Sequence, residues 1–425
     1  MVENNQHETD CRIVTNDDMP QVLHLWQTCF DDTMKFVLWY FARYWKAENT
    51  IGIFERNNGV DTLQASAQVI PYNLQIRNTN LPCGYIVGVD TAPEARNRGY
   101  AKRLLKESLC LQRERGQAIS LLMPFEGQFY YRYGWPFCYF HQRIVTDAKE
   151  LRCIAKPWGT VRKVDLFEAQ DELQRIYDMF AMRYHGTVNR TAEQWRLQLE
   201  DAQIEHTACF LIEDEQQQVQ GYFLWTPLKE KCFVREIAWS HERAKAGMLY
   251  YLMQNIPENQ KLWIDLPEDD GLKYRMAAAK NDIVLYPFLM ARIVDVKQCL
   301  EALWYPDLKA ELLLTVQDDF AEWNTGTYHI IIENNRAQVT VVGETVSEDL
   351  KQSNIPSGTI SIEGLSQMVM GTCSADTLVQ QEILCCDAAQ TPVPILQKAL
   401  RWPWQSSNSA GKWEAVSLPP PTMPN

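Results

Sequence analysis

A short segment combines a buried strand, two arginines and a glycine at close spacing. The sequence VGVDTAPEARNRGYA (87–101) runs from apolar β-forming residues through a proline turn into R-N-R-G-Y-A. If a helix begins there, its first amide N–H groups have no intrahelical partner, and the helix dipole adds partial positive charge. Gly99 permits close backbone approach, while Arg96 and Arg98 can add charge-assisted contacts. The spacing fits an anion site, and it fits a solvated loop that caps the helix equally well.

This segment resembles the acetyl-coenzyme A signature of the GNAT acyltransferase superfamily. Arg96, Gly99 and Ala101 match its core pattern, [RQ]-x-x-G-x-[GA]. The resemblance implies that backbone amides from Arg98 to Lys102 hold the pyrophosphate, and that the edge of the preceding strand binds the pantetheine arm as an added strand would. The residues predicted to bind the coenzyme are Ile86, Val87, Gly88, Val89, Arg96, Asn97, Arg98, Gly99, Tyr100, Ala101 and Lys102.

A second motif, LLMPFEGQFYYRYGW (121–135), resembles a segment of the Eis-like (enhanced intracellular survival) acetyltransferases of that superfamily. The resemblance implies that Tyr130 is a general acid toward the coenzyme A thiolate. A phenol with a pKa near ~10 can donate a proton to a thiolate of comparable basicity, so the role is chemically sensible. A core aromatic at the end of a strand is the alternative.

An amine substrate arrives as an ammonium ion, so the reaction also needs a proton acceptor. In Eis-like proteins this is the terminal carboxylate, and TPVPILQKAL (391–400) resembles the end of that family. Here Leu400 is followed by more chain, so the predicted acceptor is the terminal carboxylate of Asn425, with Glu126, Asp90 or a water chain as alternatives.

The resemblance also implies that aromatic residues of the first helices line the acceptor pocket. Ordinary packing in the helix core is the other reading of the same residues. The resemblance implies that the pocket is lined by Trp26, Phe30, Phe36, Trp39 and Tyr40. The predicted substrate-pocket residues are Phe36, Trp39, Tyr40 and Glu126.

Local patterns place these motifs in an α/β arrangement. Apolar periodicity predicts helices near 22–30 and 34–44, strands at 51–55 and 63–76, a central strand, a helix from about 100 to 116, and a strand after it. The same order of elements recurs between 172 and 267, which suggests a duplicated domain. A helix at 295–303 and four strands between 311 and 364 then predict an α+β unit.

The predicted fold class is therefore α/β and α+β, with two tandem GNAT-like mixed-sheet domains and a sterol-carrier-like α+β domain. The predicted boundaries are 1–150 for the catalytic GNAT domain, 151–290 for a degenerate second one, 291–400 for the third domain and 401–425 for a mobile tail. The second domain reads SHERAKAG (240–247) where the first has its arginine-glycine loop. Since Glu242 would repel a pyrophosphate, we expect one coenzyme site per chain.

Composition narrows the function further. A formal net charge of −13 argues against a general nucleic-acid binder. The 12 cysteines include no CxxC pair and the 7 histidines are dispersed, so neither a disulfide framework nor a metal site is predicted. The first residues carry no apolar signal segment and no run is long enough to span a membrane, which makes a cytoplasmic location the expectation.

Together these patterns predict an acetyl-CoA-dependent N-acetyltransferase that acts on a primary amine of a cationic small molecule or a lysine, such as an aminoglycoside or a polyamine. The resemblance also implies a homo-oligomer, specifically a hexamer. Two alternatives remain: a non-catalytic acetyl-CoA sensor with a lipid-binding third domain, and an aminoacyl or acyl transferase with two GNAT domains.

Overall fold

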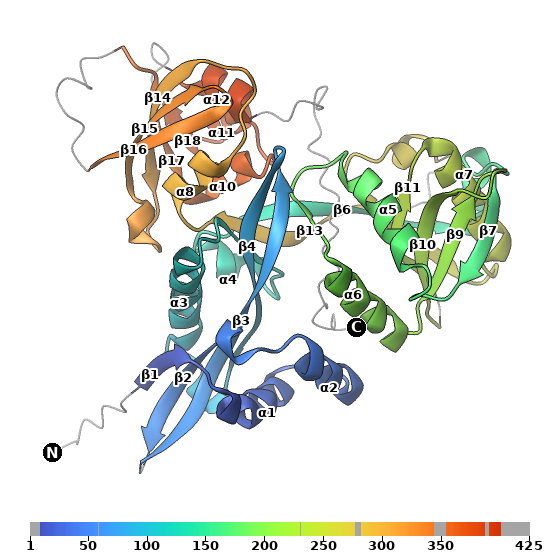
Figure 1. The fold of residues 1–425 in the computed structure, drawn as a ribbon, viewed down its shortest axis with the longest axis horizontal. Coiled ribbons are helices and arrows are strands. Elements are labelled where there is room, and N and C mark those ends of the chain that lie inside the picture. The colour runs from blue at the N-terminus through green and yellow to red at the C-terminus, as the bar shows by residue number, and fades with distance from the viewer. Residues whose placement is uncertain are drawn as a thin grey trace.

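The fold is known from a computed structural model (Figure 1), which describes residues 9–57, 59–229, 231–276, 282–343, 354–386 and 391–400. The predicted tail, 401–425, therefore lies outside the described residues. The described chain forms one 13-stranded mixed sheet and one 5-stranded sheet, with helices on their faces. Both α/β and α+β parts of the predicted fold class are confirmed.

The elements follow the predicted order closely. The strands of the large sheet are β1 (Thr9–Ile13), β2 (Thr50–Asn57), β3 (Val60–Ile76), β4 (Thr79–Thr91), β5 (Ile119–Leu122), β6 (Phe137–Asp147), β7 (Thr160–Val164), β8 (Thr187–Val188), β9 (Ala208–Glu213), β10 (Val219–Pro227), β11 (Lys231–Trp239), β12 (Lys261–Pro267) and β13 (Asp282–Ile293). Its helices are α1 (Met19–Cys29), α2 (Met34–Arg43), α3 (Tyr100–Glu114), α4 (Gly127–Tyr131), α5 (Gln170–Ala181), α6 (Ala192–Ile204) and α7 (Glu242–Asn255).

The third unit has a separate sheet in the order β16-β15-β14-β17-β18. Its elements are α8 (Val296–Ala302), β14 (Ala310–Gln317), β15 (Gly326–Glu333), β16 (Arg336–Gly343), β17 (Ser357–Ser361), α10 (Ile362–Val369), α11 (Ala375–Gln380), β18 (Leu384–Cys386) and α12 (Val393–Leu400). Its buried apolar residues are continuous with the core of the first domain, whereas the second domain has its own core. The third unit therefore packs on the first domain.

Two long strands are exchanged between the first two domains. β6 follows β5 in the chain but pairs antiparallel with β12 of the second domain, from Lys261↔Asp147 to Pro267↔His141. β13 follows β12 but returns to pair with β5, from Met290↔Leu122 to Ile293↔Ile119. β6 and β13 also pair with each other, which joins the two halves into one sheet. Each domain thus covers a strand edge that the other would leave open.

In the first domain, helices cover both faces of the sheet at the point where β4 passes between β3 and β5. On one face α2 contacts β3 through a hydrogen bond from the Tyr40 hydroxyl to Gln68 Oε1 (2.9 Å). On the other face α3 packs so closely that a Cβ at Gly84 would lie 2.6 Å from the Gln112 side chain. This arrangement fixes the start of α3 at the carboxyl end of β4, where ligands of α/β sheets bind.

Candidate functional site

The predicted arginine-glycine loop forms a tight turn between β4 and α3. Asn97 has φ 65° and Gly99, the N-cap residue of α3, has φ 83°. Glycine adopts this left-handed conformation without steric cost, and asparagine tolerates it better than most residues. A side chain at position 99 would meet no atom within 4 Å, so the space in front of the helix is open.

The first turn of α3 presents backbone donors that have no partner in the described part of the chain. The first amide of this region with a backbone acceptor is that of Arg103, which bonds the Gly99 carbonyl at 3.1 Å. No side chain caps the helix. The described residues thus leave the amides from Arg98 to Lys102, the ones predicted to hold a pyrophosphate, available to an anion.

The side chain of Arg98 does not point at this space. Its Nη1 donates to Glu55 Oε1 at 2.7 Å and its Nη2 donates to the Glu94 carbonyl at 3.0 Å. Tyr100 also donates to Glu55 Oε1, at 2.5 Å. Glu55 therefore holds the loop through Arg98 and Tyr100, and the guanidinium of Arg98 is already bonded to Glu55 and to the Glu94 carbonyl. Arg96, Asn97 and Lys102 are exposed.

Beside the loop, β4 separates from β5. The parallel pairing ends at Ile86↔Leu122, while β4 continues to Thr91. On its other edge β4 stays paired with β3, but with one extra residue between Val87↔Gln68 and Asp90↔Ser66. This bulge contains Gly88 at φ 61°. A bulge bends its strand and increases the local twist, so from Val87 onward the outer edge of β4 lacks a strand partner within the described ranges.

Gly88 can be tested directly. A Cβ at this position would lie 2.4 Å from the Trp26 ring of α1 and would also be strained at φ 61°. We expect Gly88→Ala to lower the free energy of unfolding by roughly 2–4 kcal/mol through strain and overpacking, and to weaken acetyl-CoA binding, as measured by urea unfolding and calorimetry. Gly116→Ala is the matched control, since Gly116 has φ 69° but faces only the tip of Gln298 at 3.3 Å. Equal losses in the two variants would contradict the role of the Trp26 contact.

The second domain repeats this arrangement of diverging strands followed by a helix, but its own side chains make contacts in the equivalent region. β11 and β12 pair as far as Val234↔Ile264 and then diverge. At the start of α7, however, His241 Nδ1 accepts a hydrogen bond from the Ala244 amide at 3.2 Å, and the ring of Trp158 packs edge-on against His241. Beyond the point where β11 and β12 diverge, Glu236 of β11 forms a buried ion pair with Arg190 at 2.8 Å. These contacts support the prediction of one coenzyme site per chain.

Tyr130 lies at the same end of the strands. It belongs to α4, a five-residue helix that follows β5, and not to the end of a strand as the alternative reading of this residue had it. The chain leaves β5 after Leu122, which pairs with Ile86. The segment with α4 therefore begins at the same end of the sheet as the unpaired edge of β4. Tyr130 is only 4% exposed, and burial raises the pKa of its phenol. Its hydroxyl has no hydrogen-bond partner among the described residues, which is unusual for a buried tyrosine.

The aromatic residues predicted to line the substrate pocket are buried or half-buried. Tyr40 is fully buried and Phe36 is 7% exposed, so both belong to the helix core. Trp39 is half-buried and its Nε1 donates to Glu200 of α6 at 2.9 Å, which ties α2 to the second domain. Phe125, which the sequence had not singled out, is 77% exposed and lies against Tyr130, with ring centroids 5.8 Å apart.

Asp90 of β4 lies in a buried cluster of polar side chains together with Ser66 and Gln68 of β3. Its Oδ1 accepts hydrogen bonds from the amide and the hydroxyl of Ser66, both at 2.8 Å, whereas its Oδ2 has no partner among the described residues. Burial raises the pKa of Asp90 to about 8. Gln68 Nε2, two residues along the same face of β3, is also buried without a described partner. The register of β3 and β4 creates this group, so no local sequence pattern marks Ser66 or Gln68.

The raised pKa of Asp90 predicts a pH dependence of stability. An unfolded aspartate has a pKa near ~3.9, so between about pH 4 and pH 8 the folded chain retains a proton that the unfolded chain has lost. The free energy of unfolding should therefore fall as pH rises through this window. Asp90→Asn removes this effect, so we expect its melting temperature to exceed that of the wild type by several degrees more at pH 8 than at pH 4.5. Equal differences at the two pH values in thermal scans would contradict the buried, protonated state.

The remaining predicted carboxylates differ in their surroundings. Glu126 is exposed at the N-cap position of α4, and no described side chain bonds it. Asn425 lies outside the described residues. Leu400 ends α12 against the buried Arg77, which donates to the carbonyl oxygens of Ala399 (2.8 Å) and Leu400. Arg77, and with it the end of α12, lies at the β3–β4 turn. Ten residues separate Arg77 from Val87, which corresponds to ~30 Å along a strand.

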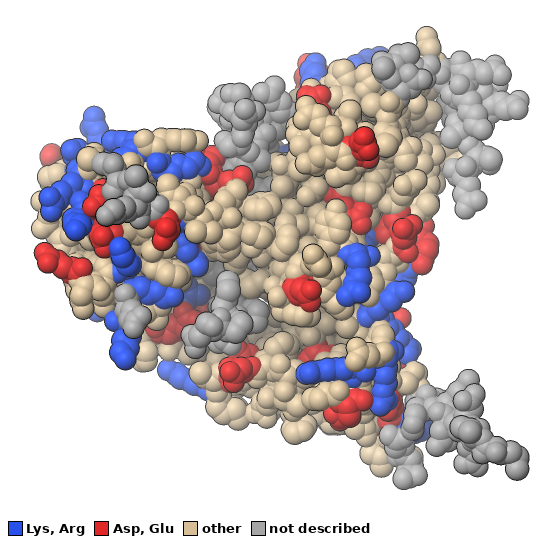
Figure 2. Space-filling model, turned by 180° about the vertical axis from the view of Figure 1, so that it is seen from behind, with Lys and Arg blue, Asp and Glu red and all other residues tan. Residues whose placement is uncertain are grey.

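Surface charge, possible metal ligands and helix length relate to the predictions about nucleic acid, metal ions and membranes. Over the face shown in Figure 2, lysine and arginine side chains are interspersed with aspartate and glutamate. Among the residues described, no three histidine, cysteine, aspartate or glutamate side chains gather as potential metal ligands. None of the described helices is both long and apolar enough to cross a membrane.

Comparison with known proteins matches these domains one by one. Residues 10–138 and 186–293 each match an acetyltransferase (GNAT) domain, and residues 296–404 match a sterol carrier protein domain. An uncharacterized N-acetyltransferase of Streptomyces griseus is 26% identical over 153 residues, which cover 35% of this chain and 36% of that protein. The chain thus aligns with about a third of the length of this curated relative.

Two solved structures share the whole architecture. A probable N-acyltransferase from Enterococcus faecalis superposes with a TM-score of 0.80 at 19% identity, covering 92% of this chain and 97% of that one. Eis1 from Mycobacterium abscessus superposes with a TM-score of 0.71 at 15% identity, covering 95% and 99%. The chain belongs to the GNAT superfamily and has the Eis-like arrangement of two GNAT domains followed by a sterol carrier protein domain.

Proposed function

We propose that the protein is an acetyl-CoA-dependent N-acetyltransferase whose one active site lies in the first domain, and that its acceptor is a primary amine of a cationic small molecule or a lysine. The GNAT family of its domains supports the reaction class. A cytoplasmic location and a homo-hexameric assembly belong to the same proposal.

The observation that carries the proposal is the open first turn of α3 beside the separated edge of β4. Amides from Arg98 to Lys102 have no acceptor among the described residues and stand at the positive end of a 15-residue helix. The adjacent edge of β4 offers main-chain donors and acceptors to an extended arm. A diphosphate joined to a pantetheine arm fits both, and the proposal of a single site is supported by the start of α7 in the second domain, where His241 caps the Ala244 amide.

In this proposal Tyr130 is the general acid. Acetyl-CoA supplies the activated acyl group: the amine nitrogen forms a bond to the thioester carbonyl carbon, the carbon–sulfur bond breaks, and an amide and coenzyme A thiol result. The Tyr130 hydroxyl is positioned to give its proton to the leaving sulfur and recovers one from the solvent. Because burial raises the pKa of Tyr130, the phenol keeps this proton throughout the physiological range, but it is also a weaker acid than the free phenol whose basicity matches that of the thiolate.

Side chains next to Tyr130 support the choice of a cationic acceptor. On the segment that leads into α4, Phe125 exposes an aromatic ring and Glu126 exposes a carboxylate that has no partner among the described residues. A protonated amine is attracted by both groups. Phe36, Trp39 and Tyr40 would then shape the pocket from behind.

The group that takes the proton of the amine is proposed to be the terminal carboxylate of Asn425, with Asp90, Glu126 or a water chain as the alternatives. The Asp90→Asn variant tests the first of these. Loss of turnover in this folded variant would assign the proton transfer to Asp90. Retained turnover would leave Glu126, a water chain and Asn425, and loss of turnover in Glu126→Gln would then assign it to Glu126.

Thiol release tests the proposal as a whole. With acetyl-CoA and spermidine or kanamycin, the full chain should release one thiol for each acetylated amine, as detected with a thiol reagent and mass spectrometry. A thermal shift with acetyl-CoA reports the coenzyme site independently. Coenzyme binding without thiol release across a broad panel of amines would favour the acetyl-CoA sensor instead.

A further inference from the structure

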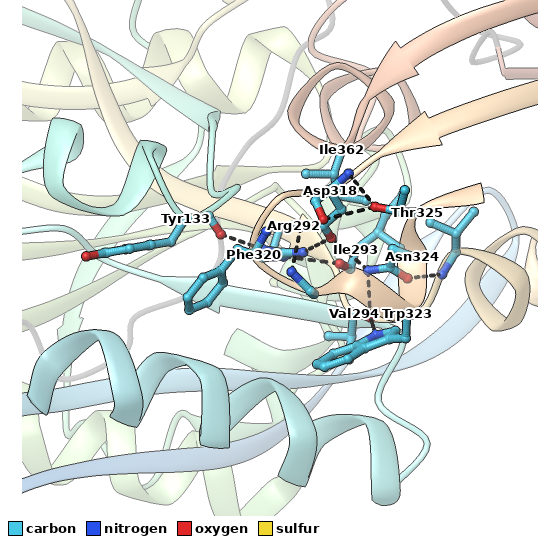
Figure 3. Close-up of polar contacts among 12 residues, drawn as sticks. Tyr133, Arg292, Ile293, Val294, Asp318, Phe320, Trp323, Asn324, Thr325 and Ile362 are labelled. Carbon is cyan, nitrogen blue, oxygen red and sulfur yellow. Dashed lines mark hydrogen bonds and ion pairs between the residues drawn. The ribbon is translucent and has the colours of Figure 1, made fainter. Parts of the chain in front are cut away.

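The segment between β14 and β15 of the third domain packs on the first domain beside the turn that follows the candidate acid. This segment, which we name the brace (residues 318–324), contacts α3 through Lys106 and the turn after α4 through Tyr133. Figure 3 shows the brace residues Asp318, Phe320, Trp323 and Asn324 together with Tyr133. The sequence motif 121–135 suggested a role for Tyr130 but gave no reason for the residues that follow it.

The turn after α4 is bound to Tyr130 through the main chain. The Tyr130 carbonyl accepts hydrogen bonds from the amides of Tyr133 (3.0 Å) and Trp135 (3.3 Å). Gly134 between them has φ 89°, and a Cβ there would lie 2.5 Å from the Arg292 guanidinium. Any displacement of this turn therefore moves the backbone that carries the Tyr130 ring.

A buried ion pair holds this turn in place. Arg292 of β13 is fully buried; its Nη1 donates to the Tyr133 carbonyl and its Nη2 donates to Asp318 Oδ2, and its guanidinium lies 4.9 Å from the Trp135 ring. Phe320 packs on Tyr133, with ring centroids 4.8 Å apart. Figure 3 shows Arg292 between Tyr133 on one side and Asp318 on the other.

Asp318 is in turn fixed within the brace. Its Oδ1 accepts from the amides of Phe320 (3.1 Å) and Ala321 (2.8 Å), and its Oδ2 also accepts from Asn324 Nδ2 (3.0 Å). Asn324 binds the Val294 carbonyl at 3.1 Å. Every oxygen of this carboxylate is thus used, and its charge is matched by one guanidinium.

The brace also contacts the coenzyme helix. Lys106 of α3 donates to the Phe320 carbonyl at 2.5 Å, pairs with Glu322 and lies 4.9 Å from the Trp323 ring. The brace therefore touches both α3, whose start faces the proposed diphosphate space, and the turn that follows the candidate acid.

We propose that Asp318, acting through Arg292 and the Tyr133 carbonyl, is a positioning residue of the acetyltransferase site, so that the third domain sets the location of the Tyr130 hydroxyl. This inference rests on the proposed function. A misplacement of about 1 Å at a reacting group can cost about 100-fold in rate, and a fixed turn on a five-residue helix prevents it.

The test compares two buried ion pairs of the same chain. In Asp318→Asn the side-chain oxygen can still accept from the brace amides, but the new amide group opposes the Arg292 donors. We expect kcat to fall about 10- to 100-fold, while KM and Kd for acetyl-CoA stay within about threefold. Glu236→Gln is the matched control, because it disrupts the buried Arg190–Glu236 pair of the second domain; it should lower the melting temperature with kcat within about twofold.

Two further measurements separate positioning from stability. Arg292→Lys keeps a cation near Asp318 but cannot also span to the Tyr133 carbonyl, so it should reproduce the loss in kcat. In the double variant of Asp318→Asn with Tyr130→Phe, kcat should be no lower than in Tyr130→Phe alone, since both changes act on one group. Multiplicative losses, or the same loss of kcat in Glu236→Gln, would overturn the proposal.

Hydrogen–deuterium exchange provides a readout that needs no turnover. The Asp318→Asn variant should exchange faster in residues 127–135 and unchanged in 83–91. Unchanged exchange in 127–135 would overturn the mechanical link. If the wild type releases no thiol with any amine but this exchange difference appears, the proposed function fails and the link between the brace and Tyr130 stands.

Discussion

Tyr130→Phe should lower kcat by roughly 100- to 1,000-fold while the Kd for acetyl-CoA stays within about twofold. General acid catalysis contributes factors of this size, and the variant removes only the hydroxyl oxygen from a side chain that is 4% exposed. That hydroxyl has no described hydrogen-bond partner, so its loss leaves no other group unpaired and the fold should be retained. Steady-state thiol release and calorimetry measure the two quantities.

Tyr131→Phe is the matched control for this prediction. Tyr131 is the next residue of α4, is 49% exposed, and loses the same atom. Its variant should keep wild-type turnover. The wild-type rate should also lack a decline at high pH up to at least pH 10, because burial raises the pKa of Tyr130 above its ordinary value. Full activity in Tyr130→Phe would remove the acid role.

A pair of substitutions at Gly99 should separate charge from shape. We expect Gly99→Asp to weaken acetyl-CoA binding at least about 100-fold relative to Gly99→Asn, a difference of about 2.7 kcal/mol. Both side chains tolerate the left-handed conformation, and neither Cβ meets an atom within 4 Å. Only the aspartate places a negative charge beside the diphosphate, and at ~5 Å this repulsion amounts to roughly 3 kcal/mol at an effective dielectric constant of ~20.

Ionic strength provides the internal check on this pair. The difference between the two variants should shrink as salt is raised, since ions screen exposed charges over about 10 Å at 0.1 M. Calorimetric titration with acetyl-CoA at two salt concentrations measures it. Equal affinities of the aspartate and asparagine variants would show that the diphosphate does not lie at the start of α3.

The sequence alone determined the features that depend on neighbours along the chain. The turn R-N-R-G-Y-A contains the residues that its left-handed positions require, and the apolar periodicity after it forms α3 as predicted. The repeat of elements and the different third unit also follow from local patterns, because helix and strand periods are set within about ten residues. The family resemblance added the expected role of Tyr130.

Only the tertiary structure decided what surrounds these motifs. β6 and β13 cross between domains because each covers the open edge of the partner's sheet, a pairing between residues more than 100 positions apart. The bulge at Gly88 places Asp90 opposite Ser66, and burial at this position raises the pKa of Asp90 against the opposing effect of the Ser66 hydrogen bonds. Arg292 and Asp318 meet behind Tyr133 because the third domain packs on the first. Strand register, burial and charge pairing at long range set these properties, and no short stretch of sequence contains them.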